Sequence, residues 1–533
     1  MSAAPDVAVP VPVPATSAAP QRTLATIRAR LVPPMPSRWW IGWLGPLVVT
    51  LIGGILRWVD LGRPHALVFD ETYYAKDALS LLRFGYERNL VDGANDILLG
   101  SNGNIASLDI FQTTPEYVVH PPLGKWTIAV GEWLFGATPF GWRWAVAVLG
   151  TLTVLMTARI VRRLTRSDLL GTVAGLLLAV EGLSIVMSRT AILDMVLTFW
   201  VLAAFGCLLL DRDRTRSRLA DLVERRGAAI GAGLGPHLGW RPWRIAAGAC
   251  LGAACAVKWS GLWFLAAFAL LSLCWDIGSR KAVGVRNPWW ATALRDVVPA
   301  AVSFVAVAVA VYLVSWTGWF LSDDAYSRQW GDDSSVIPAA LRSLWHYHAE
   351  AWRFHTTLSS AHSYQSSAFS WPFQSRPTSF YYEGFDRGQG GCTDDKCSAE
   401  VLALGNPVIW WAGLLALLHQ VWRWFAHRDW RSGAIVLAVL AGWVPWLIFP
   451  DRTIFTFYAV VYVPFVVAAL TMSLGSVLGR ADGTPRRRTW GALVAGIVVL
   501  AAVAAGWWFY PIWTGELLPY AQWNLRMWLP TWV

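Results

Sequence analysis

The amino-acid sequence predicts an all-α protein that crosses a membrane many times. Of its 533 residues, 55% are hydrophobic and only 15% are charged, which does not fit a water-soluble chain. Apolar stretches of about 20 residues, the length that a helix needs to cross the hydrocarbon core, recur along the chain. Basic residues gather in alternate connections between these stretches, as they do in polytopic membrane proteins.

The apolar stretches predict eleven membrane-spanning helices. They cover residues 39–59, 142–160, 168–187, 191–210, 244–258, 260–278, 297–316, 406–425, 432–449, 453–474 and 490–510. The fifth and sixth almost touch, which predicts a tight hairpin at Lys258, Trp259 and Ser260. A twelfth apolar stretch, 121–140, begins with two prolines and contains Lys125 and Glu132. We therefore expect that stretch to lie against the outer surface.

Charge orients the chain. With the amino terminus inside and the carboxyl terminus outside, well over half of the 44 Lys and Arg residues fall in the cytoplasmic segments, and most Asp and Glu residues fall elsewhere. This is the positive-inside asymmetry. The net charge of +10 therefore orients the protein in its membrane and does not indicate a nucleic-acid partner.

The predicted spans divide the chain into a tail, a membrane domain and two large outer loops. Residues 1–38, rich in Ala, Pro and Ser, have too few large apolar groups to fold and are predicted to be a disordered cytoplasmic tail. Residues 39–533 form the membrane domain. Its loops 60–141 and 317–405 are the connections long enough to hold a site, the first as a catalytic loop and the second as a substrate cap.

Cys392 and Cys397 lie in the second outer loop, in the sequence CTDDKC. Four intervening residues and an outward-facing loop favour a disulfide. Metal binding is the weaker alternative, because no histidine lies within ten residues.

Two acidic residues open the predicted helix of the first outer loop. Asp70 and Glu71 follow an extended apolar run in HALVFDETYYAKDA. Asp70 could serve only as the helix N-cap. The functional alternative is that a carboxylate fixed at a helix start beside the membrane is a general base.

Cationic and polar residues are predicted at the same membrane level. His120 and Lys125 lie in VVHPPLGKW, either as snorkelling or structural groups or as part of a polar site. Three cationic residues reach the outer ends of predicted spans: Arg143, Arg189 and Lys258. A charge there is costly unless it pairs with an opposite charge or binds a ligand. We expect these three cations to converge on a lipid-linked phosphate. The alternative is local neutralisation, in which Arg189 pairs with Asp194.

The second outer loop mixes histidines, aromatic residues and hydroxyls in WHYHAEAWRFHTTLSSAHSYQSSAFSWPF. Its histidine spacings do not match a helical zinc signature. Such a mixture suits a sugar or a peptide, and it also suits an ordinary packed cap. Walker, dinucleotide-binding and serine-hydrolase motifs do not occur, which disfavours mechanisms based on them.

Five motifs in this order resemble the protein O-mannosyltransferases of the GT-C class of membrane glycosyltransferases. They are FDETYYAKDA, HPPLGKW, SRTAILDM, VKWSGLW and HSYQSSAFSWPF. The resemblance covers the chain from about residue 39 to its end. It implies transfer of mannose from a polyprenyl-phosphate mannose to Ser or Thr hydroxyls of secreted proteins.

The resemblance also implies roles for single residues. The family's paired acids match Asp70 and Glu71, and an Arg at the start of the second span matches Arg143. Expected contacts to the donor phosphate and sugar come from His120, Lys125, Arg143, Arg189, Asp194 and Lys258. Expected acceptor and cap residues are His362, Tyr364, Gln365 and Trp371. Only about 89 residues separate spans seven and eight, too few for the β-trefoil domain of eukaryotic members, which favours a bacterial plasma-membrane protein.

The expected reaction is an inverting displacement in which Asp70 takes the acceptor's proton. No cofactor and no structural metal are expected, and participation of a divalent cation stays open. The expected partners are the lipid-linked donor, a secreted protein acceptor met near the translocon, and membrane lipids. One rival is a related transferase that acts on a lipid, lipoglycan or wall polymer. Another is a lipid or sugar transporter, which would place its polar residues near the bilayer midplane.

Overall fold

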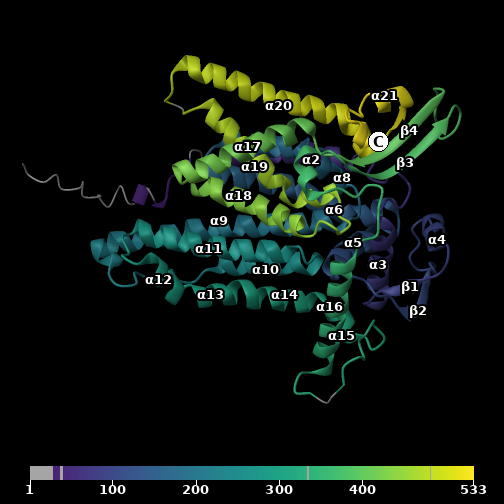
Figure 1. Cartoon of the computed structure of the whole chain (residues 1–533), viewed down its shortest axis with the longest axis horizontal. Coiled ribbons are helices and arrows are strands. Elements are labelled where there is room, and N and C mark those ends of the chain that lie inside the picture. Colours follow the sequence, from purple (N-terminus) through teal and green to yellow (C-terminus); the bar gives the residue numbers. More distant parts are fainter. Residues whose placement is uncertain (1–27, 30, 36–39, 333–334, 481) are drawn as a thin grey trace, which may run out of the picture.

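The structure is a computed structural model that describes residues 28–29, 31–35, 40–332, 335–480 and 482–533. Long helices lie side by side along the longest axis of the molecule (Figure 1). Helices α3 to α5, helix α16 and strands β3 and β4 gather at one end of this bundle, and α12 lies at the other (Figure 1). Most of the predicted tail 1–38 lies outside the described residues.

Eight helices in the described part of the chain are long and apolar enough to cross a membrane. They are α2 (Ile41–Trp58), α6 (Pro139–Thr165), α9 (Leu193–Arg226), α11 (Gly261–Ala282), α13 (Val297–Ala301) with α14 (Val307–Ser315), α18 (Trp430–Trp443) with its 3-10 extension to Ile448, the 3-10 turn Thr456–Tyr462 with α19 (Val463–Leu478), and α20 (Pro485–Thr514). A π-helical turn, Val302–Ala306, joins α13 to α14. The multi-pass, mostly helical fold class predicted from the sequence is confirmed.

The three other predicted spans are also helical, but none of them is among these eight helices. The predicted span 168–187 is broken into α7 (Asp168–Ala179) and α8 (Gly182–Ser188), which are bent by 63°. Helix α10 (Pro242–Val257) has 16 residues, and α17 (Pro407–His427) has 21. The eleven predicted positions therefore all hold helices, while the exact number of spans and their orientation stay predictions.

The break between α7 and α8 is stabilised by two buried charged side chains. Arg57, at the end of α2 and fully buried, donates to the backbone oxygens of Leu178 and Ala179 and to the hydroxyl of Ser184. Glu181 accepts from the first backbone N–H groups of α8. These bonds satisfy helix-end groups that would otherwise be unpaired in an apolar surrounding.

The predicted hairpin at Lys258 is confirmed, because α10 ends at Val257 and α11 begins at Gly261. The predicted surface helix in 121–140 is α5 (Leu123–Phe135), whose 13 residues are too few to cross a bilayer. Helix α9 runs 16 residues beyond its predicted end at 210, so part of the predicted connection 211–244 is helix.

Short elements fill the two large loops. The first holds α3 (Glu71–Phe84), β1 (Arg88–Leu90), α4 (Ala94–Gly100), β2 (Phe111–Pro115) and α5. The second holds α15 (Thr317–Leu321), α16 (Ala339–Thr357), the 3-10 turn Ala368–Phe373, β3 (Thr378–Asp386) and β4 (Lys396–Ala403). Strands β1 and β2 pair antiparallel, and β3, β4 and β5 (Leu517–Pro519) form a second antiparallel sheet that ties the second loop to the chain end before α21 (Tyr520–Asn524).

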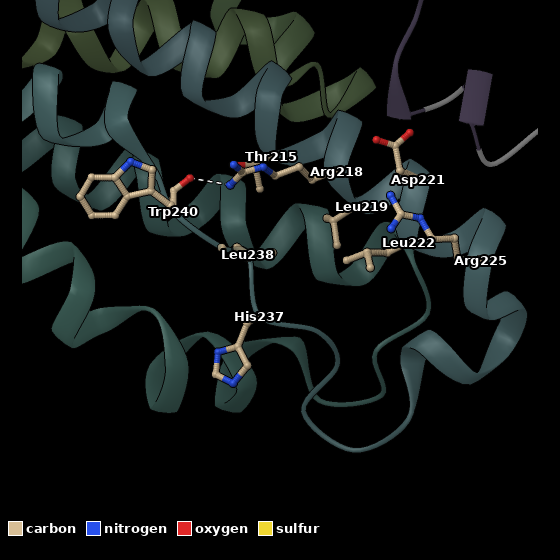
Figure 2. Close-up of a pocket in the computed structure, with 10 residues that line it drawn as sticks. Thr215, Arg218, Leu219, Asp221, Leu222, Arg225, His237, Leu238 and Trp240 are labelled. Atoms are coloured by element: carbon tan, nitrogen blue, oxygen red, sulfur yellow. Dashed lines mark hydrogen bonds between the residues drawn. The ribbon is translucent and has the colours of Figure 1, made fainter.

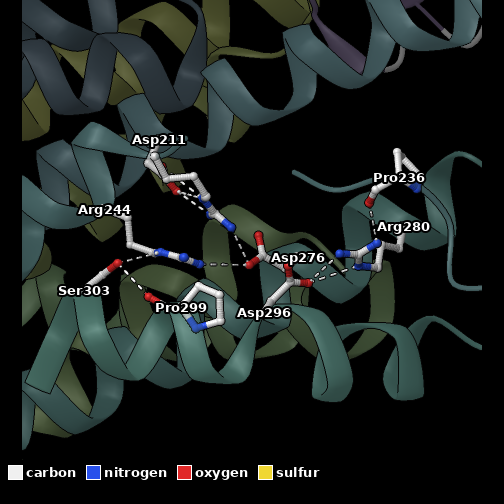
Figure 3. A network of polar contacts seen from close by, with 9 residues as sticks. Asp211, Pro236, Arg244, Asp276, Arg280, Asp296, Pro299 and Ser303 are labelled. Atoms are coloured by element: carbon white, nitrogen blue, oxygen red, sulfur yellow. Dashed lines mark hydrogen bonds and ion pairs between the residues drawn. The ribbon is translucent and has the colours of Figure 1, made fainter. Parts of the chain in front are cut away.

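A buried ionic network joins the helices at the end of the bundle that carries α12 (Pro288–Arg295). Arg241 pairs with Asp211 of α9 and, at 2.5 Å, with Asp276 of α11. Arg280 of α11 pairs with Asp296, which lies between α12 and α13, at 2.7 Å. Figure 3 shows this chain of side chains crossing from α9 to the start of α13. Because each charge has an opposite partner, the network can stay buried while it fixes the helix positions.

We expect Arg57→Met to destabilise the fold, because it removes the charged donor shared by the carbonyls of Leu178 and Ala179 at the end of α7. Hydrogen bonds to a charged group contribute about 1.5–3 kcal/mol each, so the loss in unfolding free energy should exceed about 2 kcal/mol. The measurement is thermal or denaturant unfolding in detergent. Arg480→Gln, at a side chain that is 88% exposed, is the control and should change little. Equal stability of the two variants would contradict the role given to Arg57.

Candidate active site

The site is built around the turn that precedes α3. Asp70 occupies the N-cap position of α3, yet its side chain makes no cap hydrogen bond. Phe69 has a φ of +48°, a left-handed conformation that is unfavourable for a residue with a bulky side chain. Its ring is held by Phe380, Phe455 and Phe457, with centroids 4.9–5.6 Å away. The interpretation of Asp70 as merely a helix cap therefore does not explain its placement.

Glu71 holds this turn in place through an ion pair and two hydrogen bonds from backbone N–H groups. It is fully buried and forms a two-pronged ion pair with Arg143, in which both N–O distances are 2.8 Å. The backbone N–H groups of Val68 and Ala191 also donate to its two carboxylate oxygens. Glu71 thereby joins the first outer loop to α6 and to the segment between α8 and α9. Its contacts are those of a residue that positions Asp70.

Arg143 was expected to bind the donor phosphate, and the structure places it elsewhere. It is fully buried at the start of α6. Besides Glu71, it donates to the backbone oxygens of Leu61, Pro64 and Ala66. All of its N–H groups are thus used within the protein, which leaves none for a phosphate.

Arg189 also binds backbone oxygens of the protein. Its two terminal nitrogens donate to the backbone oxygens of Arg57, Val59 and Asp60, at the end of α2. The alternative that Arg189 pairs with Asp194 is wrong as well, because Asp194 pairs with Lys258. The predicted convergence of three cations is therefore reduced to one, Lys258.

Lys258 and Asp194 form an ion pair with N–O distances of 3.0 and 2.9 Å. Asp194 lies in the first turn of α9 and Lys258 at the hairpin between α10 and α11. The Lys258 ammonium also lies over the ring of Tyr458, 4.6 Å from its centroid. The pair approaches Asp70 closely enough to act on its charge.

Asp70 has the electrostatic character of a base that works near neutral pH. Burial raises the pKa of its carboxyl to about 6; Lys258 opposes this shift and Asp194 adds to it. The Asp70 carboxylate has no hydrogen bond or ion pair with any residue that the structure describes. It is partly exposed, so its oxygens are available to a substrate.

Three further side chains lie at this site. His355 of α16 points one ring nitrogen at the backbone oxygen of Val119, 3.0 Å away, and the other at Arg452, 3.3 Å away. Its ring centre is 5.2 Å from that of His120. Since the carbonyl can only accept, His355 carries its proton on Nε2 and accepts from Arg452 on Nδ1.

Both histidines are neutral at physiological pH. Burial and the charges of Lys258 and other cations push the pKa of His120 well below its usual range. Burial and the Arg452 guanidinium lower the pKa of His355 to about 4. Arg452 thus lies beside two neutral rings, and its Nε has no partner among the described residues.

Lys125, expected to contact the donor, is buried and already paired within the protein. Its side chain is 1% exposed and pairs with Glu87, in a buried group that also contains Asp77. The contact between them is structural, because neither charge is free to reach a ligand.

The four expected cap residues divide into two groups. The exposed His362 ring lies 6.0 Å from the Phe69 ring, which brings it to the turn that carries Asp70. The backbone N–H of Tyr364 donates to the His362 ring nitrogen Nδ1, and the side-chain oxygen of Gln365 accepts from the backbone N–H of His362. Trp371, by contrast, is fully buried, and its indole N–H donates to Ser366. It supports the cap from within and has no free surface for an acceptor.

Cys392 and Cys397 form the predicted disulfide, which closes the turn between β3 and β4. Among the residues that the structure describes, no group of three or more His, Cys, Asp or Glu side chains is arranged to hold a metal ion.

Family models match two parts of the chain. One, described as dolichyl-phosphate-mannose-protein mannosyltransferase, matches residues 47–320. The other, described as the C-terminal four-helix membrane region of protein O-mannosyltransferase, matches residues 340–532.

Curated relatives match over nearly the whole chain. A polyprenol-phosphate-mannose–protein mannosyltransferase of Mycolicibacterium smegmatis is 39% identical over 92% of this chain and 93% of its own. Proteins of the same name from Mycobacterium tuberculosis and Corynebacterium glutamicum are 38% and 33% identical, with at least 91% of each chain covered.

Among solved structures, the Saccharomyces cerevisiae protein O-mannosyltransferase Pmt1-Pmt2 complex bound to the sugar donor aligns with a TM-score of 0.70 and 14% identity. The alignment covers 96% of this chain and 94% of that one. ArnT from Cupriavidus metallidurans bound to undecaprenyl phosphate aligns with a TM-score of 0.50 and 15% identity, over 89% and 77% of the two chains. The likeness to the yeast structure confirms the expected GT-C type fold, and the family models and relatives show that this chain belongs to the protein O-mannosyltransferase family.

Proposed function

We propose that this protein transfers mannose from a polyprenyl-phosphate mannose to Ser or Thr hydroxyls of a secreted protein, at the outer face of the bacterial plasma membrane. The relatives that are 33% to 39% identical to it carry the matching enzyme name. The observation that carries the proposal is the Asp70 carboxylate, a partly exposed base without a partner among the described residues, next to the Lys258 ammonium.

In the proposed step, Asp70 accepts the proton of the acceptor hydroxyl as its oxygen attacks the anomeric carbon of mannose. The new C–O bond forms on one face of the sugar while the bond to the phosphate oxygen breaks on the other, and the phosphate leaves with the electron pair. This opposed arrangement inverts the anomeric centre. A phosphate leaving group needs no proton, only cations to hold its charge.

Lys258 and Arg452 are the cations that we assign to the phosphate. Asp194 holds Lys258 through two oxygens, and neutral His355 holds Arg452 through Nδ1. His120, whose ring centre lies 5.2 Å from that of His355, is a neutral ring that can bond a sugar hydroxyl without adding charge. A planar guanidinium and an ammonium together suit a phosphate with several oxygens.

The acceptor approaches from the side of His362, above the Phe69 ring. Tyr364 and Gln365 extend this exposed surface, and we assign it to the protein chain that carries the Ser or Thr. A site at the end of the bundle that holds the large loops suits an acceptor met as it leaves the translocon.

The product of the reaction tests the proposed function. Membranes that contain the protein are incubated with labelled polyprenyl-phosphate mannose and a Ser/Thr-rich peptide, and a peptide with every Ser and Thr replaced by Ala is the control. We expect label on the first peptide only. Label that reaches a glycolipid and neither peptide would favour the rival transferase that acts on lipids.

The pKa of Asp70 predicts how the rate depends on pH. Because a base works only when deprotonated, and the pKa is raised to about 6, kcat/KM should be level between pH 7 and 8 and fall about tenfold per unit below pH 6. The measurement is a pH–rate profile at low donor concentration. A rate unchanged from pH 7 to pH 5 would exclude Asp70, with this pKa, as the base.

Removal of the Arg452 charge should weaken binding of the donor. Arg452→Gln loses one charge-assisted contact of about 1.5–3 kcal/mol, so polyprenyl phosphate should bind about tenfold to a hundredfold less tightly. His355→Phe should weaken binding in the same direction, because it frees the Arg452 side chain, while His355→Gln keeps an acceptor and should recover part of the affinity.

The control for these variants is Arg387→Gln, an exposed arginine of the β3–β4 turn that pairs with Asp395. It removes the same charge on the same side of the protein. Equal affinities for Arg452→Gln, Arg387→Gln and the wild type would remove Arg452 from the phosphate site.

A further inference from the structure

A cavity lies at the end of α9 that is far from the active site. Helix α9 has 34 residues, so it extends about 51 Å from Asp194 to its end. Its last turns and the loop 237–240 enclose a cavity of about 340 Å³. That volume lies within the range of pockets that bind small molecules.

The cavity has an apolar floor. Leu219 and Leu238 are buried there beside Leu222. They belong to a small hydrophobic core separate from that of the bundle, which also includes Leu31 and Ala291 of α12. The leucines of the floor are therefore held in place by packing within this core.

The rim of the cavity is cationic. Figure 2 shows Arg218 and Arg225 on the same helix with Leu219 and Leu222 between them, and His237 and Leu238 on the loop below. Arg218 donates to the backbone oxygen of Trp240, which leaves most of its N–H groups unused. Arg225 has no hydrogen bond or ion pair with any described residue.

The acidic residues near this rim are already engaged. Arg28 pairs with Glu224 at 2.6 Å and with Asp221, the acidic residue that lines the cavity, at 3.4 Å. Arg28 thereby offsets part of the negative charge of Asp221 and Glu224, and the three arginines Arg28, Arg218 and Arg225 leave this group with a net positive charge.

Tryptophans place the cavity at the level of a membrane surface. Trp240 on the rim and Trp289 and Trp290 of α12 are each 68% to 71% exposed. Tryptophan rings collect at the boundary between hydrocarbon and head groups, where an apolar body and a polar N–H are both satisfied. A ligand that enters here from the bilayer presents its head group to the arginines.

We propose that this cavity binds the head group of an anionic phospholipid. Its phosphate pairs with Arg218 and Arg225, and the first carbons of its chains rest on Leu219, Leu222 and Leu238. An apolar floor beneath a cationic rim at the interface matches an amphiphile with a negative head group better than a free anion. The site is distinct from the donor site, which lies at the other end of α9.

The test compares lipids in their effect on thermal unfolding. Protein in neutral phosphatidylcholine nanodiscs is compared with protein in nanodiscs that contain increasing fractions of phosphatidylglycerol. A ligand that binds the folded state raises Tm with its concentration. We expect phosphatidylglycerol to raise the Tm of the wild type, and the double variant Arg218→Gln/Arg225→Gln to need roughly tenfold to thirtyfold more lipid for the same shift.

The matched control is Arg486→Gln/Arg487→Gln, which removes two exposed arginines at the start of α20. It should respond to phosphatidylglycerol as the wild type does. Equal losses of response in both double variants would overturn the proposal in favour of general surface attraction. An equal shift with inorganic phosphate would overturn it in favour of a free-anion site.

A photoreactive phosphatidylglycerol gives a second readout that does not depend on the variants' stability. Peptide mapping of the wild type should find the cross-link between residues 215 and 240. Cross-links confined to other helices would also overturn the proposal.

Discussion

The buried pair of Glu71 and Arg143 is the interaction on which the site depends. An isolated charge in this surrounding would cost several kcal/mol, and here both partners are also hydrogen-bonded to backbone. Through these bonds one side chain joins the first outer loop, α6 and the start of α9. The neighbouring Asp70 can then be held without bonds of its own, with its oxygens free for a proton. A carboxylate that fixed its own position by hydrogen bonds would be a weaker base.

The end of the bundle that carries the two large loops separates two kinds of charge. Arg57 and Arg189 bind carbonyls at helix ends and Arg143 binds carbonyls of the loop after α2, so the three maintain irregular backbone in an apolar surrounding. Lys258 and Arg452 are held by a single side chain each and keep capacity for a ligand. A site formed by broken helices and long loops needs both kinds of cation. Some must stabilise the irregular backbone, and others must stay available to a ligand.

Much of the fold could be predicted from the sequence, and less of the site. Apolar length located the eleven helical positions and the hairpin at Lys258, because hydrophobic burial depends mainly on local composition, whereas the surface position of α5 stays a prediction. The bend at Glu181 was missed because a short α8 keeps the apolar pattern of a continuous span. Position along a span also could not distinguish Arg143 from Lys258, since their roles depend on partners that lie far away in the chain. Arg452 and His355 were not selected, because each becomes significant only when α16 packs on the loop before the 3-10 turn Thr456–Tyr462.

The most direct test of the account is the single-turnover rate of Asp70→Asn at saturating donor, with thermal stability and donor affinity measured on the same preparation. The amide is nearly isosteric and cannot accept the proton, and a positioned base contributes about 10²- to 10⁴-fold in rate. The account predicts a loss of that size with stability and affinity unchanged. A folded variant that binds donor and transfers mannose at the wild-type rate would contradict it.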